Sequence, residues 1–270
     1  MPLVTVLIPT LNAEKFLESA LISIKKQNFS DYEVVCVDAG SSDDTLQILE
    51  RFNVKILQCL PGISGQLNYG LDYTDSRFVA RFDADDLMMP NRLKNQTQFM
   101  DQSKVNVIGS NVLLKRGHLM RPKIMPKNHH DIKLYAMLRN PLTHPSVMFE
   151  RDLLIRYDSK YDGIEDYELW LRLLKNTGFR FANLQNFTTV YRRHGGQVTA
   201  DTLTSEITKK RKEILRNYLC DVKISLPISM LLEISNRSGS CTLLDKIAIC
   251  KEFKNLGFSK MWQPLLFGIL

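Results

Sequence analysis

Apolar and polar positions alternate in blocks along the first third of the chain, and the blocks predict strands and helices in turn. Residues 4–10 are apolar and β-branched, as in a strand that is covered on both faces. The further elements expected here are strands at 33–37, 54–60 and 77–82, and helices over 16–24, over 45–52 and in a short stretch ending at 71. Right-handed crossovers turn such a series into a parallel, doubly wound α/β sheet flanked by helices.

The rest of the chain continues both patterns with more variety. Its expected elements are a helix near 90–102, strands at 105–110 and 111–116, a helix near 130–138, a strand at 146–149, an amphipathic helix over 165–177, and strands at 179–184 and 187–193. Beyond residue 199 the pattern becomes helical and basic. We therefore expect an α/β domain over residues 1–199 and a basic helical C-terminal extension over residues 200–270.

The net charge of +7 is concentrated in this extension. Residues 203–270 hold 11 Lys and Arg residues against 6 Asp and Glu residues, in a chain whose 44% hydrophobic and 24% charged residues are typical of a globular protein. The asymmetry favours contact with something anionic, which is a membrane surface, a lipid phosphate or nucleic acid. A solvated helical face explains the same asymmetry equally well.

Cysteine usage and the apolar runs predict a cytoplasmic protein. The five cysteines form no CxxC or Cys/His pattern, and Cys36 and Cys59 lie in apolar runs typical of a core. The first twelve residues resemble a strand rather than a signal peptide, and no apolar run approaches the ~18 residues of a spanning helix. We expect a soluble protein, or one attached peripherally at the inner face of the cell membrane.

Polar residues follow the four predicted parallel strands where each strand ends, which is where open α/β sheets bind ligands. They are Thr10 and Asn12, then Asp38 with Gly40 and Ser41, then Gly62 and Gly65, and finally Asp83, Asp85 and Asp86. Neither GxxxxGK[ST] nor GxGxxG is present. An acidic edge repels phosphate unless a divalent cation lies between them, and oxygen ligands favour Mg²⁺ or Mn²⁺ over Zn²⁺. The sequence therefore predicts a metal that holds a diphosphate.

A series of motifs, in order and spacing, resembles the family 2 glycosyltransferases of the GT-A fold over residues 3–199. The motifs are VTVLIPTLN, VDAGSSDD, RFDADDLMMPNRL, HPSVMF, EDYELWLRLL and YRRHGGQ. The resemblance implies a Rossmann-like, mostly parallel sheet and an inverting, metal-dependent enzyme. Such an enzyme moves one sugar from a nucleotide-sugar to a hydroxyl of a glycan or lipid-linked acceptor, as in lipopolysaccharide, capsule or O-antigen biosynthesis, without a nucleic-acid partner.

The same resemblance implies a nucleotide site at the first two strand ends. Pro9, Thr10 and Asn12 match residues that lie beside the base. Asp38 matches an aspartate that accepts a hydrogen bond from a uracil or thymine imide, which favours a UDP-sugar donor. Ala39 departs from the family's usual DDGS pattern, so one acidic contact to the ribose is absent from the expected set.

Later motifs carry the implied metal and diphosphate site. Asp83 and Asp85 match the DxD pair, in which the first acid touches the ribose or the metal and the second ligates the metal through the diphosphate. His194 matches a histidine that completes the metal or diphosphate site. Arg81 either pairs with the acidic edge or contacts the diphosphate.

Glu165 and Asp166 match the acidic pair among which the family keeps its catalytic base. We assign the base to Asp166, because a carboxylate in the first turn of a helix is favoured by the dipole and is ionised at neutral pH. The ordinary preference for acidic residues at helix starts, where they cap the helix, is enough to explain one of these two acids without a catalytic role. His144 is expected to line the acceptor pocket. The QxxRW motif of processive members is absent and QVTAD follows His194 instead, which favours addition of a single sugar.

Three other functions share parts of this pattern. A sugar-nucleotide pyrophosphorylase needs a GxGTR-like loop after the first strand, where this chain has PTLNAEK. A phosphatase with a DxD nucleophile needs Thr or Val soon afterwards, where this chain has DADDLMMP. A non-catalytic nucleotide-sugar-binding protein has no use for the acidic pair at 165–166.

The end of the chain adds a prediction about location. Basic residues at 209–216 lie beside apolar ones, and residues 262–270 are aromatic and apolar. A cationic helix with an apolar terminus favours peripheral attachment to an anionic bilayer. Packing of the same segment onto the α/β domain is the alternative.

Overall fold

The computed structural model describes residues 1–153, 155–195 and 205–220. The strands are β1 (Val4–Thr10), β2 (Tyr32–Asp38), β3 (Lys55–Gln58), β4 (Phe78–Arg81), β5 (Leu87–Met88), β6 (Val107–Arg116), β7 (Leu119–Lys123), β8 (Met148–Glu150) and β9 (Phe181–Arg192). The helices are α1 (Glu14–Lys25), α2 (Thr45–Arg51), α3 (Ile63–Tyr73), α4 (Arg92–Gln102), α5 (His129–Tyr135), α6 (Glu165–Leu174) and α7 (Ser205–Leu219), with 3₁₀ turns at His144–Ser146, Arg151–Leu153 and Ser159–Tyr161.

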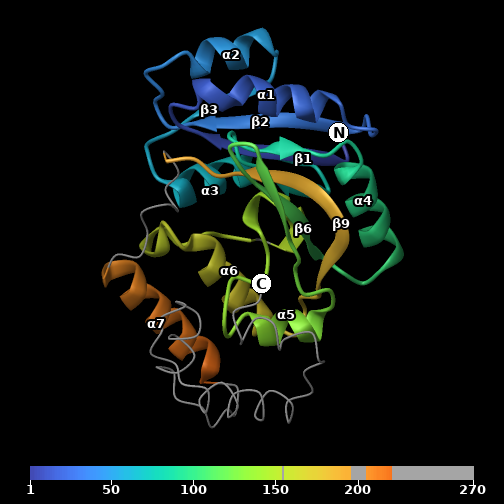
Figure 1. Cartoon of the computed structure of the whole chain (residues 1–270), viewed down its shortest axis with the longest axis vertical. Coiled ribbons are helices and arrows are strands. Elements are labelled where there is room, and N and C mark those ends of the chain that lie inside the picture. Colours follow the sequence, from blue (N-terminus) through green and yellow to red (C-terminus); the bar gives the residue numbers. More distant parts are fainter. Residues whose placement is uncertain (154, 196–204, 221–270) are drawn as a thin grey trace.

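The strands form one sheet in the order β3-β2-β1-β4-β8-β6-β9-β5, with β7 paired to the outer part of β6 (Figure 1). The first four strands are parallel, so the carboxyl ends of β1, β2 and β4 lie at one edge. β8 is antiparallel to both of its neighbours, and β9 runs parallel to β6. The α/β class and the parallel, Rossmann-like half of the sheet are thus as predicted, and the second half is mixed.

Alternating side chains place a separate apolar core on each face of the sheet. Val6 and Ile8 pack with residues of α1, α2 and α4, whereas Leu7 packs with residues of α3 and α6. Figure 1 shows α1 and α2 on one side of β1 and β2, with α3 on the other. Gly70 of α3 lies so close to Leu7 that an added Cβ would overlap the leucine side chain. This close approach brings α3 onto the sheet beside the strand ends.

Two expectations about strands were wrong. One strand, β6 (Val107–Arg116), replaces the two expected at 105–110 and 111–116, and one strand, β9 (Phe181–Arg192), replaces the two expected at 179–184 and 187–193. The ladder between β6 and β9 shifts its register around Asn111 without ending, as bulged strands do. Strands β5 and β7 were not predicted from the sequence. The strand expected at 146–149 begins only at Met148, because a 3₁₀ turn containing Pro145 precedes it.

Helix α7 is the described part of the C-terminal extension. Its Ile214, Leu215 and Tyr218 are buried in the same core as the apolar face of α6. Arg211 of α7 donates a hydrogen bond to the carbonyl of Leu138 at 2.9 Å. This part of the extension therefore packs onto the α/β domain. The boundary expected at 199/200 and the segment expected to bind membrane at 262–270 lie outside the described residues.

Within the ranges that the structure describes, no helix combines the length and the apolar composition that crossing a bilayer requires.

The buried guanidinium of Arg92 joins the end of β4 to the chain around residues 145–147. Arg92 is 0% exposed, and it donates to the carbonyls of Arg81 (2.8 Å), Pro145 (2.5 Å) and Val147 (3.1 Å). Its Nε donates to Gln96, whose amide in turn donates to the Ser146 carbonyl. Burial lowers the pKa of Arg92 to about 9. Burial thus disfavours the charged guanidinium, and the hydrogen bonds to the carbonyl oxygens offset part of that cost.

Arg92→Met should destabilise the protein strongly, because the buried carbonyls of Arg81 and Pro145 would lose this donor, whereas the Val147 carbonyl keeps the Arg81 N–H. At about 1–3 kcal/mol for each unsatisfied group, the free energy of unfolding should fall by at least ~2 kcal/mol. Urea titration followed by circular dichroism measures this, with the slope m as a check on the unfolded state. Arg92→Lys keeps the charge without the fork of donors and should recover only part of the loss. A fall below ~1 kcal/mol for Arg92→Met would contradict the role assigned to the guanidinium.

Candidate functional site

The carboxylate of Asp38, at the end of β2, is surrounded by its own loop. Its Oδ1 accepts hydrogen bonds from the hydroxyls of Thr10 (3.1 Å) and Ser41 (2.6 Å). Its Oδ2 accepts from the backbone N–H groups of Gly40 (3.0 Å) and Ser41 (2.8 Å). Asp38 is 0% exposed, so these bonds occupy the acceptor positions that a carboxylate offers. Direct pairing of Asp38 with a base imide stays a prediction, in which the imide would share the carboxylate with these loop donors.

Asn12, after β1, is the exposed member of this corner. It has a φ of 48°, its backbone N–H donates to the Ser41 hydroxyl at 2.9 Å, and its side-chain oxygen accepts from the Ser42 N–H at 2.9 Å. Pro9 and Ala39 are both buried. Of the four residues expected at this end of the nucleotide site, Asn12 is therefore exposed to solvent. Pro9, Thr10 and Asp38 are buried beneath the loop.

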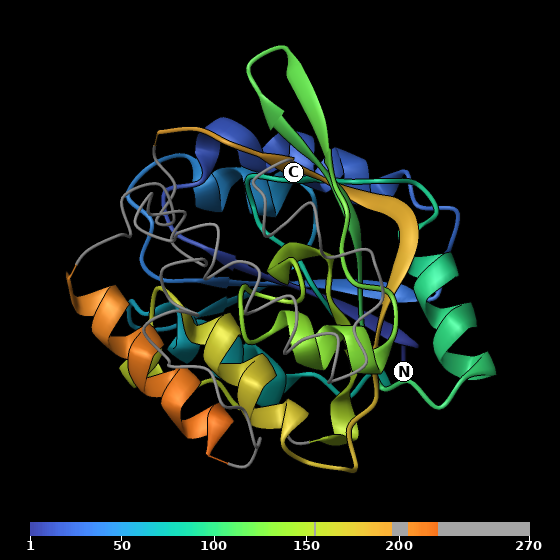
Figure 2. The same ribbon diagram turned by 60° about the horizontal axis from the view of Figure 1, so that its bottom comes forward.

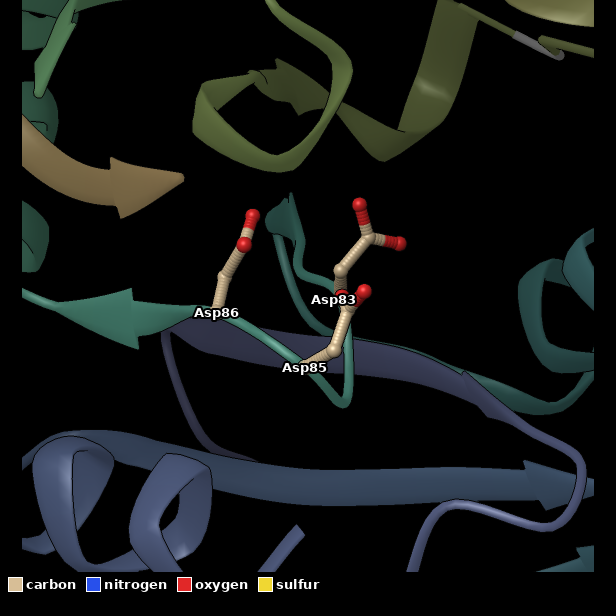
Figure 3. A group of neighbouring side chains, drawn as sticks. All are labelled: Asp83, Asp85 and Asp86. Atoms are coloured by element: carbon tan, nitrogen blue, oxygen red, sulfur yellow. The ribbon is translucent and has the colours of Figure 1, made fainter. Parts of the chain in front are cut away.

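Three carboxylates rise from the loop after β4 toward the same side (Figure 3). One oxygen from each of Asp83, Asp85 and Asp86 lies within 4.8 Å of the other two. Asp86 is buried, its Oδ1 accepts from the backbone N–H of Arg192, and its Oδ2 has no hydrogen-bond partner among the described residues. Burial, with the charges of Asp83 and Asp85, raises the pKa of Asp86 well above its ordinary value. Closely spaced oxygens with one orphaned buried atom fit a hard divalent cation.

Arg192 and His194 bring the end of β9 to this acidic loop. The Arg192 guanidinium donates to the carbonyls of Asp85 and Asp86, and its Nη1 donates to the Ser19 hydroxyl at 2.7 Å. His194 Nε2 lies 2.9 Å from Asp85 Oδ2, and its ring packs at 4.4 Å from the ring of Phe16. His194 is thus beside the acidic cluster, as expected, with a ring nitrogen directed at Asp85.

Arg81 forms an ion pair with the first acid of the cluster. Its Nη1 lies 2.5 Å from Asp83 Oδ1, and its side chain is 5% exposed. Burial raises the pKa of Asp83, and the charge of Arg81 opposes that rise. Of the two roles expected for Arg81, pairing with the acidic edge is the one present in the structure.

The acidic pair of α6 lies in a buried setting. Asp166 Oδ2 accepts a hydrogen bond from the side-chain amide of Asn140 at 2.5 Å, and its Oδ1 accepts from the Tyr167 N–H at 2.7 Å. Burial raises the pKa of Asp166 despite these donors. The expectation of a carboxylate made more acidic by the helix N-terminus was therefore wrong in direction, because loss of hydration outweighs the dipole. For Glu165, burial and then the charge of Asp166 raise the pKa to about 7.

His144 lies behind Glu165. Its Nε2 is 2.9 Å from the Tyr157 hydroxyl, its Nδ1 is 3.9 Å from Glu165 Oε1, and its ring meets the edge of Trp170 at 5.9 Å. It is 7% exposed, and burial lowers its pKa well below the ordinary value. A neutral, buried imidazole with three neighbours lies against the acidic pair, and its role in lining an acceptor pocket stays a prediction.

Several residues of the site were not assigned from the sequence. Asp86 belongs to the acidic run but was left out of the metal set, and Arg192 lies in the quoted YRRHGGQ motif. Asn140 follows no pattern that points to Asp166, 26 positions away. Long-range partners of this kind become visible only when the fold brings separate segments together.

The sequence is similar to a known family of proteins and to individual members with assigned activities. The sequence model of "Glycosyl transferase family 2" matches residues 5–155. The chain is 28% identical over 208 residues to the O-antigen biosynthesis glycosyltransferase WbnJ of Escherichia coli, which spans 72% of this chain and 81% of that protein. It is 27% identical over 222 residues to the UDP-Glc:alpha-D-GlcNAc-diphosphoundecaprenol beta-1,3-glucosyltransferase WfaP of Escherichia coli, spanning 80% of this chain and 84% of that one.

A solved structure supports the fold. The crystal structure of S. aureus TarS 1-349 in complex with UDP-GlcNAc superposes with a TM-score of 0.66 at 21% identity, covering 99% of this chain and 79% of that chain. The likeness confirms the fold expected from the sequence.

Unfolding should depend on pH through Glu165. Its pKa is about 7 in the folded protein and 4.5 at its ordinary value, so between these values the folded protein holds a proton that the unfolded chain has lost. The stabilising contribution of this group is full below about pH 4.5 and declines as the pH rises to about 7, by at most about 1.4 kcal/mol per pH unit. Urea titrations at several pH values should show wild type losing stability relative to Glu165→Gln over this window, then running level above it. A difference between the two proteins that stays constant with pH would rule out the raised pKa.

Proposed function

The chain belongs to glycosyl transferase family 2 and is a glycosyltransferase, and we propose that it transfers one sugar from a UDP-sugar to a hydroxyl of a lipid-linked glycan. The observation that carries the proposal is that the acidic loop after β4 and the acidic pair of α6 share one electrostatic environment. The charge of Asp166 contributes to the raised pKa of Asp83, and the charge of Arg81 opposes the rise for Asp83, Asp166 and Glu165 alike. A donor diphosphate and an acceptor hydroxyl need two such groups within reach of one another.

Asp166 is the proposed base. In a single displacement the acceptor hydroxyl attacks C1 of the donor sugar on the side opposite the nucleoside diphosphate, and Asp166 removes the hydroxyl proton. A pKa raised by burial makes the carboxylate a better proton acceptor, provided that it remains ionised. Asn140 supports this state, because its amide donates to Asp166 Oδ2 and so holds the carboxylate in one orientation.

Glu165 and His144 are proposed as supports for the base. Glu165 Oε2 accepts the backbone N–H of Gly163 at 2.8 Å, which closes the turn before α6. A Glu165 that is partly protonated near neutral pH also avoids placing a second full charge beside Asp166. His144 and Tyr157 fill the space behind this carboxyl.

We propose Asp83, Asp85 and Asp86, with His194 beside them, as the residues that hold Mn²⁺ or Mg²⁺. The oxygen-rich donor set and the orphaned Oδ2 of Asp86 support a hard cation. When bound, such a cation stabilises the negative charge that grows on the leaving phosphate. Arg81 and Arg192 keep the loop in place whether or not a cation is present, since their partners are its own carboxylate and carbonyls.

A UDP-sugar is proposed because one relative, WfaP, is a UDP-Glc-dependent glucosyltransferase and one structural neighbour, TarS, binds UDP-GlcNAc. The corner formed by Asn12 and residues 40–42 is the proposed seat of the base, because it combines exposed polar atoms with a rigid hydrogen-bonded loop. In this arrangement Asp38 shapes the loop and Asn12 faces the nucleotide.

The acceptor is proposed to be lipid-linked because the WfaP relative acts on a diphosphoundecaprenol-linked sugar. Such an acceptor lies at a membrane, so the protein would work at the cytoplasmic face of the cell membrane as a peripheral enzyme.

Donor binding should depend on the acidic loop and a divalent cation. By calorimetry, UDP should bind in the presence of Mn²⁺ more tightly than GDP or ADP, and binding should weaken at least about tenfold in EDTA or in Asp85→Ala. Asp152→Ala, which removes an exposed acid elsewhere on the surface, is the matched control and should bind as wild type does. Tight UDP binding in EDTA by wild type, or preference for GDP, would refute the donor and metal assignments.

Asp166→Asn should bind UDP normally and lose sugar transfer by roughly two orders of magnitude or more, because proton removal is worth about 10²–10⁴ in rate. Transfer from a UDP-sugar panel to a synthetic lipid-linked acceptor, followed by mass spectrometry, measures the rate. Asn140→Ala should lower the rate less, since it removes only the hydrogen bond that orients the Asp166 carboxylate. If Glu165→Gln proves more damaging than Asp166→Asn, the base is Glu165.

A further inference from the structure

The hairpin formed by β6 and β7 extends beyond the body of the molecule. Figure 2 shows this green hairpin projecting past the neighbouring helices and strands. Its strands pair up to Arg116↔Leu119, and Gly117, with a φ of 58°, makes the turn. Residues 107–112 are buried, whereas exposure increases from Leu113 to the tip. Only the base of the hairpin therefore belongs to the protein core.

The tip combines exposed apolar side chains with cations. Leu119 and Met120 are 65% and 51% exposed, and Ile124 just beyond β7 is 47% exposed. Four cations lie within the same ten residues: Lys115, Arg116, Arg121 and Lys123. The chain has no acidic residue from 102 to 130. In the described part of the chain, none of these four side chains forms a salt bridge.

Protection of an exposed sheet edge explains only part of this composition. Charged residues and proline on an outer strand discourage pairing with other chains, which accounts for Arg121, Pro122 and Lys123 on β7. It does not account for Leu119 and Met120, two adjacent apolar residues that are exposed next to the turn of the hairpin.

We propose that this hairpin docks on an anionic phospholipid bilayer, with Leu119 and Met120 entering the interface and the cations lying against the phosphates. Apolar side chains at a tip and basic residues beside them are the two components that interfacial attachment requires. Charge complementarity selects the partner, because Lys115, Arg116 and Arg121 near the turn are cationic and form no salt bridge with the residues that the structure describes.

Both ends of the hairpin are linked to the candidate site. Near the turn, Lys115 pairs with Arg192 of β9, and its carbonyl accepts the Arg193 N–H at 2.7 Å, just before His194. At the base, Lys123 pairs with Val112; burial lowers its pKa to about 8, while the charge of Asp166 raises it. A bilayer held by the tip would therefore lie at the end of β9 that leads to His194, a link to catalysis that rests on the proposed function.

Vesicle flotation of the full chain tests the docking surface. Wild type should float with phosphatidylglycerol-containing vesicles at low salt, stay behind with pure phosphatidylcholine, and release at high salt. Arg116→Gln/Arg121→Gln should reduce the partition coefficient about 30-fold, given the contribution of each basic residue near a charged surface. Leu119→Ser/Met120→Ser should reduce it at least about tenfold.

Matched controls remove the same groups from other surfaces. Lys26→Gln/Lys94→Gln deletes two exposed cations, and Leu60→Ser deletes an apolar side chain that is 85% exposed. Both should float as wild type does, and the circular dichroism spectrum and urea midpoint of every variant should report an intact fold. Hairpin variants that float like wild type would overturn the proposal and assign attachment to another segment. Because flotation needs no turnover, loss of the proposed enzymatic function would leave this result unaffected.

Discussion

The buried guanidinium of Arg92 is the interaction on which the site depends. It holds the carbonyl of Arg81, the last residue of β4, together with the carbonyls of Pro145 and Val147. The acidic loop begins two residues after Arg81, and His144, which supports Glu165, directly precedes Pro145. One side chain thus sets the separation between the acids of the β4 loop and those of α6. A buried charge bound only by neutral groups is costly, and it is tolerated here because it satisfies the carbonyl of Pro145 in the 3₁₀ turn and that of Arg81 at the end of β4.

The acids of the site are kept close by cations that the protein itself supplies. Three carboxylates within one loop repel one another, and burial of Asp86 increases that repulsion. Arg81 neutralises Asp83, and the guanidinium of Arg192 binds the carbonyls of Asp85 and Asp86. The loop backbone is therefore fixed while Oδ2 of Asp86 has no hydrogen-bond partner among the described residues, which leaves that oxygen for a cation.

The sequence predicted features that depend on local pattern and missed those that depend on distant partners. The β-branched runs of β1 and β2 and the polar residues at their ends were sufficient to predict the parallel half of the sheet and the position of the site. The two-residue strand β5 carries no periodicity, and the polar edge strand β7 lacks the apolar alternation that reveals a strand. The surroundings of Asp38 and Asp166 cannot be read from the local pattern alone. One donor to Asp38 is Thr10, 28 positions away in the chain. The fold buries Asp166 and so raises its pKa, while Asn140, 26 positions away, donates a hydrogen bond that opposes this rise.

The closed hydrogen-bonded loop around Asp38 has a consequence for how such a protein changes over generations. Because the carboxylate binds Thr10, Gly40 and Ser41, the loop keeps its shape without help from a ligand. The exposed Ser42 contributes its backbone N–H to that corner, so its side chain can vary without loss of the scaffold, whereas Asn12 is held by its own side-chain bond and a φ of 48°. After gene duplication, two copies could then diverge at such positions with the folding of both preserved. A rigid corner with a replaceable outer side chain would let related chains come to differ in the nucleotide that they bind.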